Sequence, residues 1–229
     1  MKNCAFIFVR GGSKGLPRKN IKLLAGKPLL QYSIDTALTA PSIDQVFVST
    51  DDAEIADVAY AAGAIVIDRP AELASDTSPE WLSWRHAVEW VQVHYGEFDG
   101  FVSLPATSPL RSVDDVEGAI NKLILTEADI CISVTPACRS PFFNMVKLTE
   151  SGMVELVNNP QGEVVRRQDA PEVFDITTVV YATTPNFVLT HNGIFSGKVT
   201  SIEVPKERAV DIDDIYDFKL AEAIIQGNS

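Results

Sequence analysis

The chain contains few cysteines and histidines, and this shortage argues against a protein stabilised by zinc or by disulfides. Its 229 residues include three of each type. They do not occur at the close, paired spacing of a zinc site. An odd number of cysteines is also not the pattern of a disulfide framework. We therefore expect Cys4 and Cys131, which lie in apolar runs, to be ordinary core residues.

Positive charge is also scarce, and long apolar runs are missing. Lys and Arg total 19 against 31 Asp and Glu, which gives a formal net charge of −12. Such an acidic chain is a poor general ligand for nucleic acid or for an anionic membrane. The N-terminal apolar run, residues 4–9, is too short for a signal peptide or a membrane span. These features predict a cytoplasmic protein with no nucleic-acid partner and no membrane partner.

What the chain does have is a regular alternation of predicted strands and helices up to residue 137. Short apolar runs are separated by segments with helical spacing. The expected strands are residues 4–9, 45–50, 64–69, 100–105 and 129–137, and the expected helices follow Pro28 or cover 53–63, 79–95 and 113–128. Such alternation is typical of βαβ units. The sequence therefore predicts an α/β fold with a doubly wound, mostly parallel sheet.

The pattern changes after about residue 135. Residues 135–178 predict short strands joined by turns, which we interpret as a small β-rich excursion from the main sheet. A closing amphipathic helix is expected over 211–225. No internal repeat or long linker divides the chain, so we predict a single domain, 1–229, with an insertion at 135–178.

The densest basic stretch, "FVRGGSKGLPRKN" (residues 8–20), directly follows the first predicted strand. Ligands bind at the carboxyl edge of a parallel sheet, where this loop would lie. Its glycines allow a tight turn whose N–H groups can hold an anion, and its Arg and Lys residues add charge. The P-loop motif and the dinucleotide-binding motif are both absent. The loop therefore predicts a polyphosphate site, with a flexible basic surface loop as the alternative.

An acidic pair, Asp211 and Asp213, precedes the last predicted helix. In an extended segment, residues two apart point to the same side. Two such carboxylates together with a triphosphate suit Mg²⁺. The alternative is that Asp213 and Asp214 only complement the dipole of the last helix. For Asp51 and Asp52, which follow the second strand, we favour the simpler role of helix N-cap.

Several motifs then occur in one order from end to end of the chain. They are "RGGSKGLPRKNIKLLAGKPLLQYSI", "VSTDD", "RPAELASDTS", "PATSPLR", "RRQDAPEVFD" and "DIDDIYDFKLAE". This set resembles the CMP-sialic acid synthetases, or N-acylneuraminate cytidylyltransferases, including those for legionaminic acid. The resemblance implies a nucleotide-diphospho-sugar transferase-like fold and transfer of CMP from CTP to a nine-carbon 2-keto sugar acid, with release of pyrophosphate. It also implies Mg²⁺, a homodimer and a dimerisation role for residues 135–178.

The resemblance assigns roles to particular residues. It implies nucleotide binding by Arg10, Gly11, Gly12, Ser13, Lys14, Lys19, Asn20 and Arg69, with Arg10, Lys19 and Asp211 catalytic and with Asp211 and Asp213 as metal ligands. It implies sugar binding by Ser108, Arg111, Arg167 and Gln168. Two alternatives stay open: Arg111 as a surface ion pair, and Arg167 as an interface salt bridge. A dedicated base at Asp211 and activation of the hydroxyl by the metal alone also both remain open.

Departures from the family pattern bear on the sugar. Pro105 and Ala106 stand where Gln and Pro are common, and Asp175 replaces a basic residue. These differences favour a legionaminate-like acid over N-acetylneuraminate. The alternatives for the whole chain are a cytidylyltransferase for the eight-carbon acid Kdo and a non-catalytic nucleotide-sugar binding protein.

Overall fold

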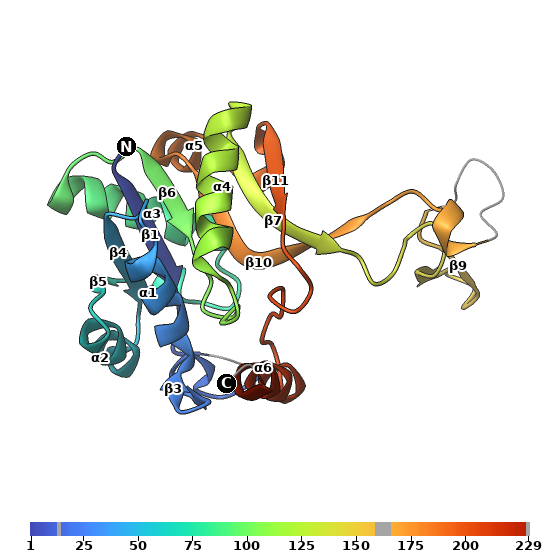
Figure 1. The fold of residues 1–229 in the computed structure, drawn as a ribbon, viewed down its shortest axis with the longest axis horizontal. Coiled ribbons are helices and arrows are strands. Elements are labelled where there is room, and N and C mark those ends of the chain that lie inside the picture. The colour runs from blue at the N-terminus through green and yellow to red at the C-terminus, as the bar shows by residue number, and fades with distance from the viewer. Residues whose placement is uncertain (13–14, 159–165, 228–229) are drawn as a thin grey trace.

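A computed structural model describes residues 1–12, 15–158 and 166–227, without the side chain of Arg167. Its centre is a seven-stranded sheet in the order β11-β7-β10-β6-β1-β4-β5 (Figure 1). The strands are β1 (Asn3–Phe8), β4 (Gln45–Thr50), β5 (Ile65–Asp68), β6 (Gly100–Ser103), β7 (Ile130–Pro136), β10 (Phe174–Thr183) and β11 (Val199–Glu203). β10 runs antiparallel to β6 and β7, and the other pairs are parallel. The predicted fold class is therefore confirmed.

Helices cover both faces of this sheet, and alternate strand residues pack against each layer. One core joins α1 (Leu29–Thr39), α2 (Ala53–Ala61) and α4 (Val113–Thr126) to residues such as Ala5 and Ile7. The other joins α3 (Glu80–Tyr95) and α5 (Pro185–Thr190) to Cys4 and Phe6. Strands covered on both faces are continuous apolar runs, which explains why β1 was recognisable from the sequence. Cys4 and Cys131 are buried, as predicted.

Helix boundaries follow the capping chemistry of the sequence. Asp52 accepts a hydrogen bond from the Ile55 N–H and caps α2, which confirms the role predicted for it. Gly63 follows α2 at a φ of 90°, where glycine is favoured. Ser112 and Asp115 form a capping box at the start of α4.

Other elements were not expected from the sequence. The segment 184–210 forms α5 and β11, and β11 pairs in parallel with β7 at the edge of the sheet. β2 (Leu23–Leu24) and β3 (Lys27–Pro28) form a small hairpin, so Pro28 precedes α1 instead of lying in its first turn. Short 3₁₀ helices are η1 (Lys19–Ile21), η2 (Ala71–Leu73), η3 (Arg167–Asp169) and η4 (Ile194–Ser196).

The β-rich excursion projects from one side of the body (Figure 1). It carries the hairpin of β8 (Val146–Leu148) and β9 (Val154–Leu156), and the long strands β7 and β10 form its base. β10 already pairs with β7 from Phe174 onward. Residues 174–178 therefore belong to the main sheet, and the excursion runs over 137–173, which is narrower than the predicted 135–178. We call residues 137–173 the arm.

The last helix, α6 (Ile215–Gly227), packs against β2, which lies early in the sequence. A third apolar cluster joins it to the segment that follows β1, through Leu16, Leu24, Leu29, Ile212, Phe218 and Ala221. Ile212 is fully buried in this cluster. Its burial fixes residues 211–213, between β11 and α6, beside the basic loop (residues 10–20).

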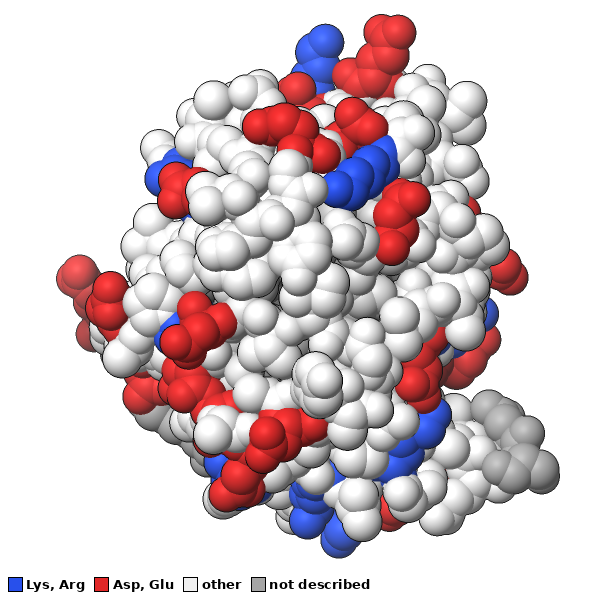
Figure 2. All heavy atoms as spheres, turned by 90° about the vertical axis from the view of Figure 1, so that its left-hand side faces the viewer, with Lys and Arg blue, Asp and Glu red and all other residues white. Residues whose placement is uncertain are grey.

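The excess of acidic residues is visible on the surface. Figure 2 shows one face of the molecule, on which Asp and Glu side chains are spread widely and Lys and Arg are fewer. Among the described residues, no helix is long and apolar enough to cross a membrane.

Candidate functional site

The candidate site lies at the carboxyl edge of the parallel strands. β1, β4, β5 and β6 run in the same direction, so the residues after each of them meet at one edge. These residues are the basic loop after β1, Asp51 and Asp52 after β4, Arg69 after β5, and the 105–111 loop after β6.

The basic loop is held by its neighbours through close backbone approaches. The Gly11 N–H donates to Asp51 Oδ1 at 3.1 Å. A side chain at Gly11 would meet Asp52, and one at Gly15 would meet the Asp213 backbone oxygen. These contacts explain why glycine is favoured at both positions. They also argue against the alternative of a flexible surface loop, because the loop packs against neighbouring segments. Ser13 and Lys14 lie outside the described residues.

Lys19 joins the basic loop to the acidic segment (residues 211–214). Its side chain is buried, and its Nζ donates to the Ile212 carbonyl at 2.5 Å. The same Nζ lies 3.5 Å from Asp213 Oδ1. A lysine and an aspartate that are 194 positions apart in the sequence thus share one site, as the resemblance implies.

Two adjoining pockets open beside these residues. The glycine-loop pocket has a volume of about 310 Å³, and its walls include Phe8, Arg10, Gly12, Gly15, Lys19, Asn20, Thr107 and Asp213. The Arg69 pocket has a volume of about 280 Å³, and its walls include Phe8, Arg10, Arg69, Ser78, Glu80 and Ser83. They share Phe8 and Arg10, so together they form one continuous cleft along the edge of the sheet.

Arg10 and Asn20 are held at this shared wall. Arg10 forms an ion pair with Asp76 at 2.6 Å, and its carbonyl accepts a hydrogen bond from Asn20 Nδ2 at 3.2 Å. Both side chains were predicted to contact the nucleotide, and both line the cleft.

Arg69 is buried beneath its pocket. It donates to the Ser49 carbonyl at 2.6 Å and to Ser49 Oγ at 3.1 Å, and its guanidinium lies 5.7 Å from the Phe8 ring centre. Burial lowers the pKa of Arg69 to about 10, so it remains charged at neutral pH. In the same pocket Ser78 Oγ is buried without a hydrogen-bond partner among the described residues. The sequence analysis did not single out Ser78, although it lies in the "RPAELASDTS" motif.

In the acidic segment, Asp211 and Asp214 differ in role. Asp214 accepts hydrogen bonds from the Tyr216 and Asp217 N–H groups and therefore caps α6. Asp211 Oδ1 is buried and has no hydrogen-bond partner among the described residues. Burial raises the pKa of Asp211, and the nearby Asp213 carboxylate raises it further, whereas the Thr107 and Thr178 hydroxyls and Lys19 oppose this. The helix-capping alternative thus applies to Asp214 and leaves Asp211 unexplained.

This donor set fits a hard divalent cation. Asp211 and Asp213 offer carboxylate oxygens, and the exposed Asp213 faces the glycine-loop pocket. The described residues contain no group of three or more acidic, histidine or cysteine side chains that could hold a metal alone. A cation here would therefore complete its coordination with ligand oxygens and water, as Mg²⁺ does when it is bound with a phosphate.

Ser108 and Arg111 lie in the core behind the site. Ser108 Oγ is 2.7 Å from Thr178 Oγ1. Arg111 donates to the Val179 carbonyl, to Ser33 Oγ and to the Pro105 carbonyl at 2.5–2.6 Å. It is 5% exposed and has no ion-pair partner among the described residues, so it is not a surface ion pair. Its guanidinium ties the 105–111 loop to β10 and α1.

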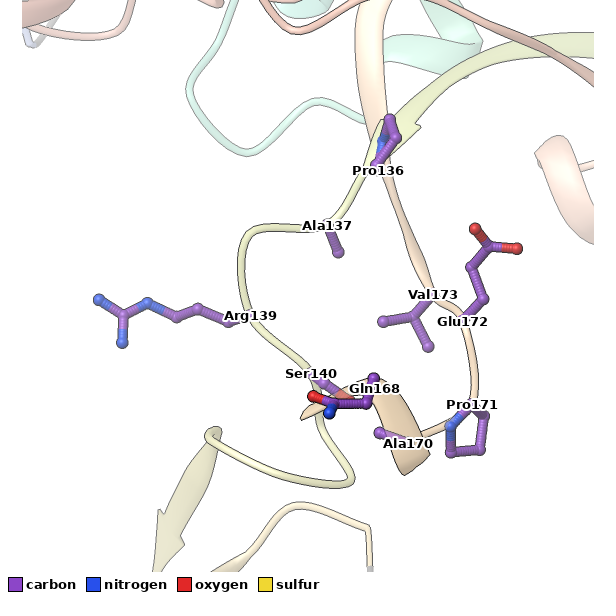
Figure 3. Close-up of a pocket in the computed structure, with 9 residues that line it drawn as sticks. All are labelled: Pro136, Ala137, Arg139, Ser140, Gln168, Ala170, Pro171, Glu172 and Val173. Carbon is purple, nitrogen blue, oxygen red and sulfur yellow. The ribbon is translucent and has the colours of Figure 1, made fainter. Parts of the chain in front are cut away.

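Arg167 and Gln168 lie in η3, within the arm and away from the cleft of the same chain (Figure 1). The side chain of Arg167 is outside the described residues, whereas Gln168 is exposed. Gln168 lines a pocket of about 450 Å³ in the arm, with residues such as Ala137, Ser140 and Val173 (Figure 3). Arg139 extends away from the other lining side chains in that view. Within one chain, the structure does not bring Gln168 to the cleft.

Comparisons with known proteins agree with this geometry. A family model described as cytidylyltransferase matches residues 4–195. The chain is 33% identical over 222 residues to the CMP-N,N′-diacetyllegionaminic acid synthase of Campylobacter jejuni, covering 96% of this chain and 93% of that one. It is 31% identical over 229 residues to a pseudaminic acid cytidylyltransferase of the same species, covering 100% and 98%.

A solved structure shows the same fold. The CMP:2-keto-3-deoxy-manno-octonic acid synthetase complexed with CTP superimposes with a TM-score of 0.75 over 100% of both chains, at 16% identity. The resemblance found in the sequence motifs is confirmed by these matches. With the family model covering most of its length, this chain belongs to the cytidylyltransferase family.

Proposed function

We propose that this protein transfers CMP from CTP to the anomeric hydroxyl of a nine-carbon 2-keto sugar acid and releases pyrophosphate. The names of the two Campylobacter jejuni relatives state that they act on N,N′-diacetyllegionaminic acid and on pseudaminic acid. The observation that carries the proposal is the contact of Lys19 with the acidic segment, because it brings the basic loop to the residues that include Asp211 and Asp213.

The cleft offers separate places for the parts of CTP. Arg10, Lys19 and the backbone of the basic loop at Gly11 and Gly12, with Ser13 and Lys14, lie against the triphosphate, although the Gly11 N–H itself donates to Asp51. Arg69 contacts the base in the pocket that also holds the unpartnered Ser78 Oγ, and Asn20 contacts it from the adjoining glycine-loop pocket. Cations beside the leaving pyrophosphate stabilise the charge that develops on it.

The reaction brings together two anions, the sugar acid and the triphosphate. The cations of the site reduce the repulsion between them. The sugar hydroxyl oxygen attacks the α-phosphorus of CTP, a new P–O bond forms, and the bond to pyrophosphate breaks. Asp211 and Asp213 would hold Mg²⁺, which when bound would screen the phosphate charge and lower the pKa of the hydroxyl. We also assign to Asp211 the acceptance of the hydroxyl proton, because its Oδ1 has no hydrogen-bond partner among the described residues.

The arm and the cysteines support two further parts of the proposal. A homodimer in which the arm reaches the partner's cleft gives Arg167 a target, the sugar carboxylate, and gives Gln168 a place beside it. Ser108 supports the sugar side of the cleft from behind. Three free cysteines suit a reducing cytoplasm, which is where we place the enzyme.

The proposal is tested by measuring pyrophosphate release from CTP and Mg²⁺ with a panel of sugar acids. The panel contains N,N′-diacetyllegionaminic, pseudaminic and N-acetylneuraminic acids and Kdo. We expect release with at least one nine-carbon acid. Release with Kdo alone would assign the enzyme to the eight-carbon substrate of its structural neighbour. CTP binding without release from any acid would favour a non-catalytic nucleotide-binding protein.

A further inference from the structure

A third cavity, the α6 groove, adjoins the acidic segment and has no role in the function proposed above. It lies between α6 and the base of the arm, which Figure 1 shows on either side of the loop from β11 to α6. Its volume of about 600 Å³ falls within the range of about 300–1,000 Å³ typical of small-molecule sites. Thr135 of β7, Ile176 of β10 and Leu220 of α6 lie along its walls.

The α6 groove begins where the nucleotide cleft ends. Asp211 lines the groove, and Asp213 and Thr107 line the glycine-loop pocket. The Ile212 N–H donates to the Thr107 carbonyl at 2.8 Å, so the two cavities adjoin where residues 211–213 contact Thr107. A molecule whose reacting hydroxyl lies at Asp211 therefore extends either over the nucleotide, where space is already taken, or into the α6 groove.

The walls of the groove combine apolar surface with hydrogen-bonding groups. Ile176 and Leu220 are 48% and 52% exposed, so their side chains are available to a ligand. Thr135 is only 8% exposed, and its Oγ1 has no hydrogen-bond partner among the described residues. A buried hydroxyl without a partner is costly unless a ligand or water completes it.

Charge around the groove is predominantly negative. Asp175, Glu207, Asp211 and Asp217 line it, against a single cation, Lys206. These carboxylates repel the carboxylate of a sugar acid but accept hydrogen bonds from hydroxyl and amide N–H groups. The anionic end of the acid is thereby kept out of the groove, and the uncharged end is turned into it.

An N-acylamino group matches these walls closely. It presents an N–H donor, a carbonyl acceptor and a methyl group, and the groove offers carboxylate acceptors, the Thr135 hydroxyl and apolar side chains. Resting on the function proposed above, we propose that the α6 groove binds the N-acylamino end of the acceptor and selects acids with two N-acyl groups. Kdo, which has none, leaves the Thr135 hydroxyl and the apolar walls without partners.

The test compares variants of the groove with a matched variant elsewhere. Leu220→Asn and Thr135→Val change the groove, and Leu38→Asn alters a leucine of similar exposure, 51%, on α1. Pyrophosphate release is measured with N,N′-diacetyllegionaminic acid, N-acetylneuraminic acid and Kdo, at varied acid and at varied CTP. Thermal unfolding of each variant verifies that it is folded.

We expect the wild type to prefer the diacetylated acid to Kdo by at least about a hundredfold in kcat/KM. In Leu220→Asn and Thr135→Val, the KM for the diacetylated acid should rise about tenfold while the KM for CTP stays constant. Leu38→Asn should behave as the wild type.

Three results would overturn the inference. If the wild type is active and neither groove substitution changes the KM for the acid, the groove does not bind the acid, and the proposed function is unaffected. An equal rise in Leu38→Asn shows that the effect is not specific to the groove. A wild type that releases no pyrophosphate with any nine-carbon acid removes the proposed function, and the inference falls with it.

Discussion

At the residue scale, the site depends on side chains whose positions are fixed by buried contacts with the backbone. Lys19 contacts the Ile212 carbonyl, and Ile212 is itself locked in the cluster beneath α6. Arg69 is bound to Ser49 in the same manner. Because these cations are held before a ligand arrives, little reorganisation is needed when the triphosphate binds. The sequence motifs predicted that Arg10, Lys19 and Arg69 belong to this site, but not the contacts that hold them, and they did not indicate Ser78.

The first prediction at this scale concerns Asp211. Asp211→Asn should lower kcat by about a hundredfold or more, because it removes a metal ligand and a proton acceptor. Stability should be unchanged or slightly higher, since burial raises the pKa of this carboxyl and the fold disfavours its charged form. Steady-state kinetics and thermal unfolding measure the two effects.

The neighbouring Asp214→Asn is the control for that experiment. Asparagine also caps helices, so this variant should retain both the turnover and the stability of the wild type. Full activity of Asp211→Asn at high Mg²⁺ would argue against a direct metal role.

The second prediction separates two roles for Arg111. Arg111→Met leaves the Val179 and Pro105 carbonyls and Ser33 Oγ without their buried donor. We expect the free energy of unfolding to fall by about 3 kcal/mol in urea titrations, with the KM for the sugar acid unchanged. Lys122→Met, at an exposed position on α4, should have no such effect. Wild-type stability combined with a raised acid KM would instead make Arg111 a substrate ligand.

At the element scale, much of the first part of the fold was predictable from local chemistry. β4 occupies the predicted residues 45–50, and α2 begins after its predicted cap. The later elements were not, because β11 is a short edge strand of mixed burial and α5 has six residues. The first half of β10, residues 174–178, was assigned to the excursion, although it pairs with β7 in the main sheet. These elements are defined by pairing with β7, which no local pattern reports.

The third prediction concerns the start of α2. Asp52 caps the helix and also forms an ion pair with Arg18 of the basic loop at 2.6 Å. Asp52→Ala removes both interactions and should destabilise the protein by about 1 kcal/mol or slightly more. Asp52→Asn keeps the cap and should cost less. Equal losses in the two variants would show that the charge, and not the cap, is what matters.

The same pair predicts a dependence on pH. The hydrogen bond from Arg18 lowers the pKa of Asp52 below its ordinary value of 3.8. A lowered carboxyl pKa contributes stability that is present above that ordinary value and is lost as the pH falls through the folded-state pKa. The stability difference between wild type and Asp52→Asn should therefore be constant near neutral pH, begin to shrink near pH 3.8 and disappear once the pH is below the folded-state pKa. Urea titrations across this range measure it.

At the scale of the whole molecule, the chain divides its tasks between a rigid body and an arm. The body holds the cleft and the α6 groove, and the arm carries Gln168 away from both. The location of the arm was predictable from the change of pattern after residue 135. The limits of the arm were not predictable, because β7 and β10 remain paired as far as Pro136 and Phe174, where the apolar pattern of the sequence is already weak. In the proposed homodimer, the arm acts on a second copy of the chain.

The hairpin in the arm exposes an unusual amount of apolar surface. Val146, Leu148, Met153 and Val154 are 58–76% exposed. A two-stranded hairpin is marginally stable by itself in water, and clustered exposed apolar side chains mark interaction surfaces. We therefore expect Leu148→Lys to weaken the proposed homodimer, because it places a charge in the surface that would be buried.

Light scattering over a range of protein concentrations measures this effect, with Leu125→Lys as the control. Leu125 is 81% exposed on α4, in the body, and its substitution should leave the dimer intact. If the arm also completes the partner's cleft through Arg167, then Leu148→Lys should raise the KM for the sugar acid about tenfold and leave CTP binding unchanged. A wild type that is monomeric and fully active at every concentration would remove the dimer from the proposed function and leave Arg167 without a target.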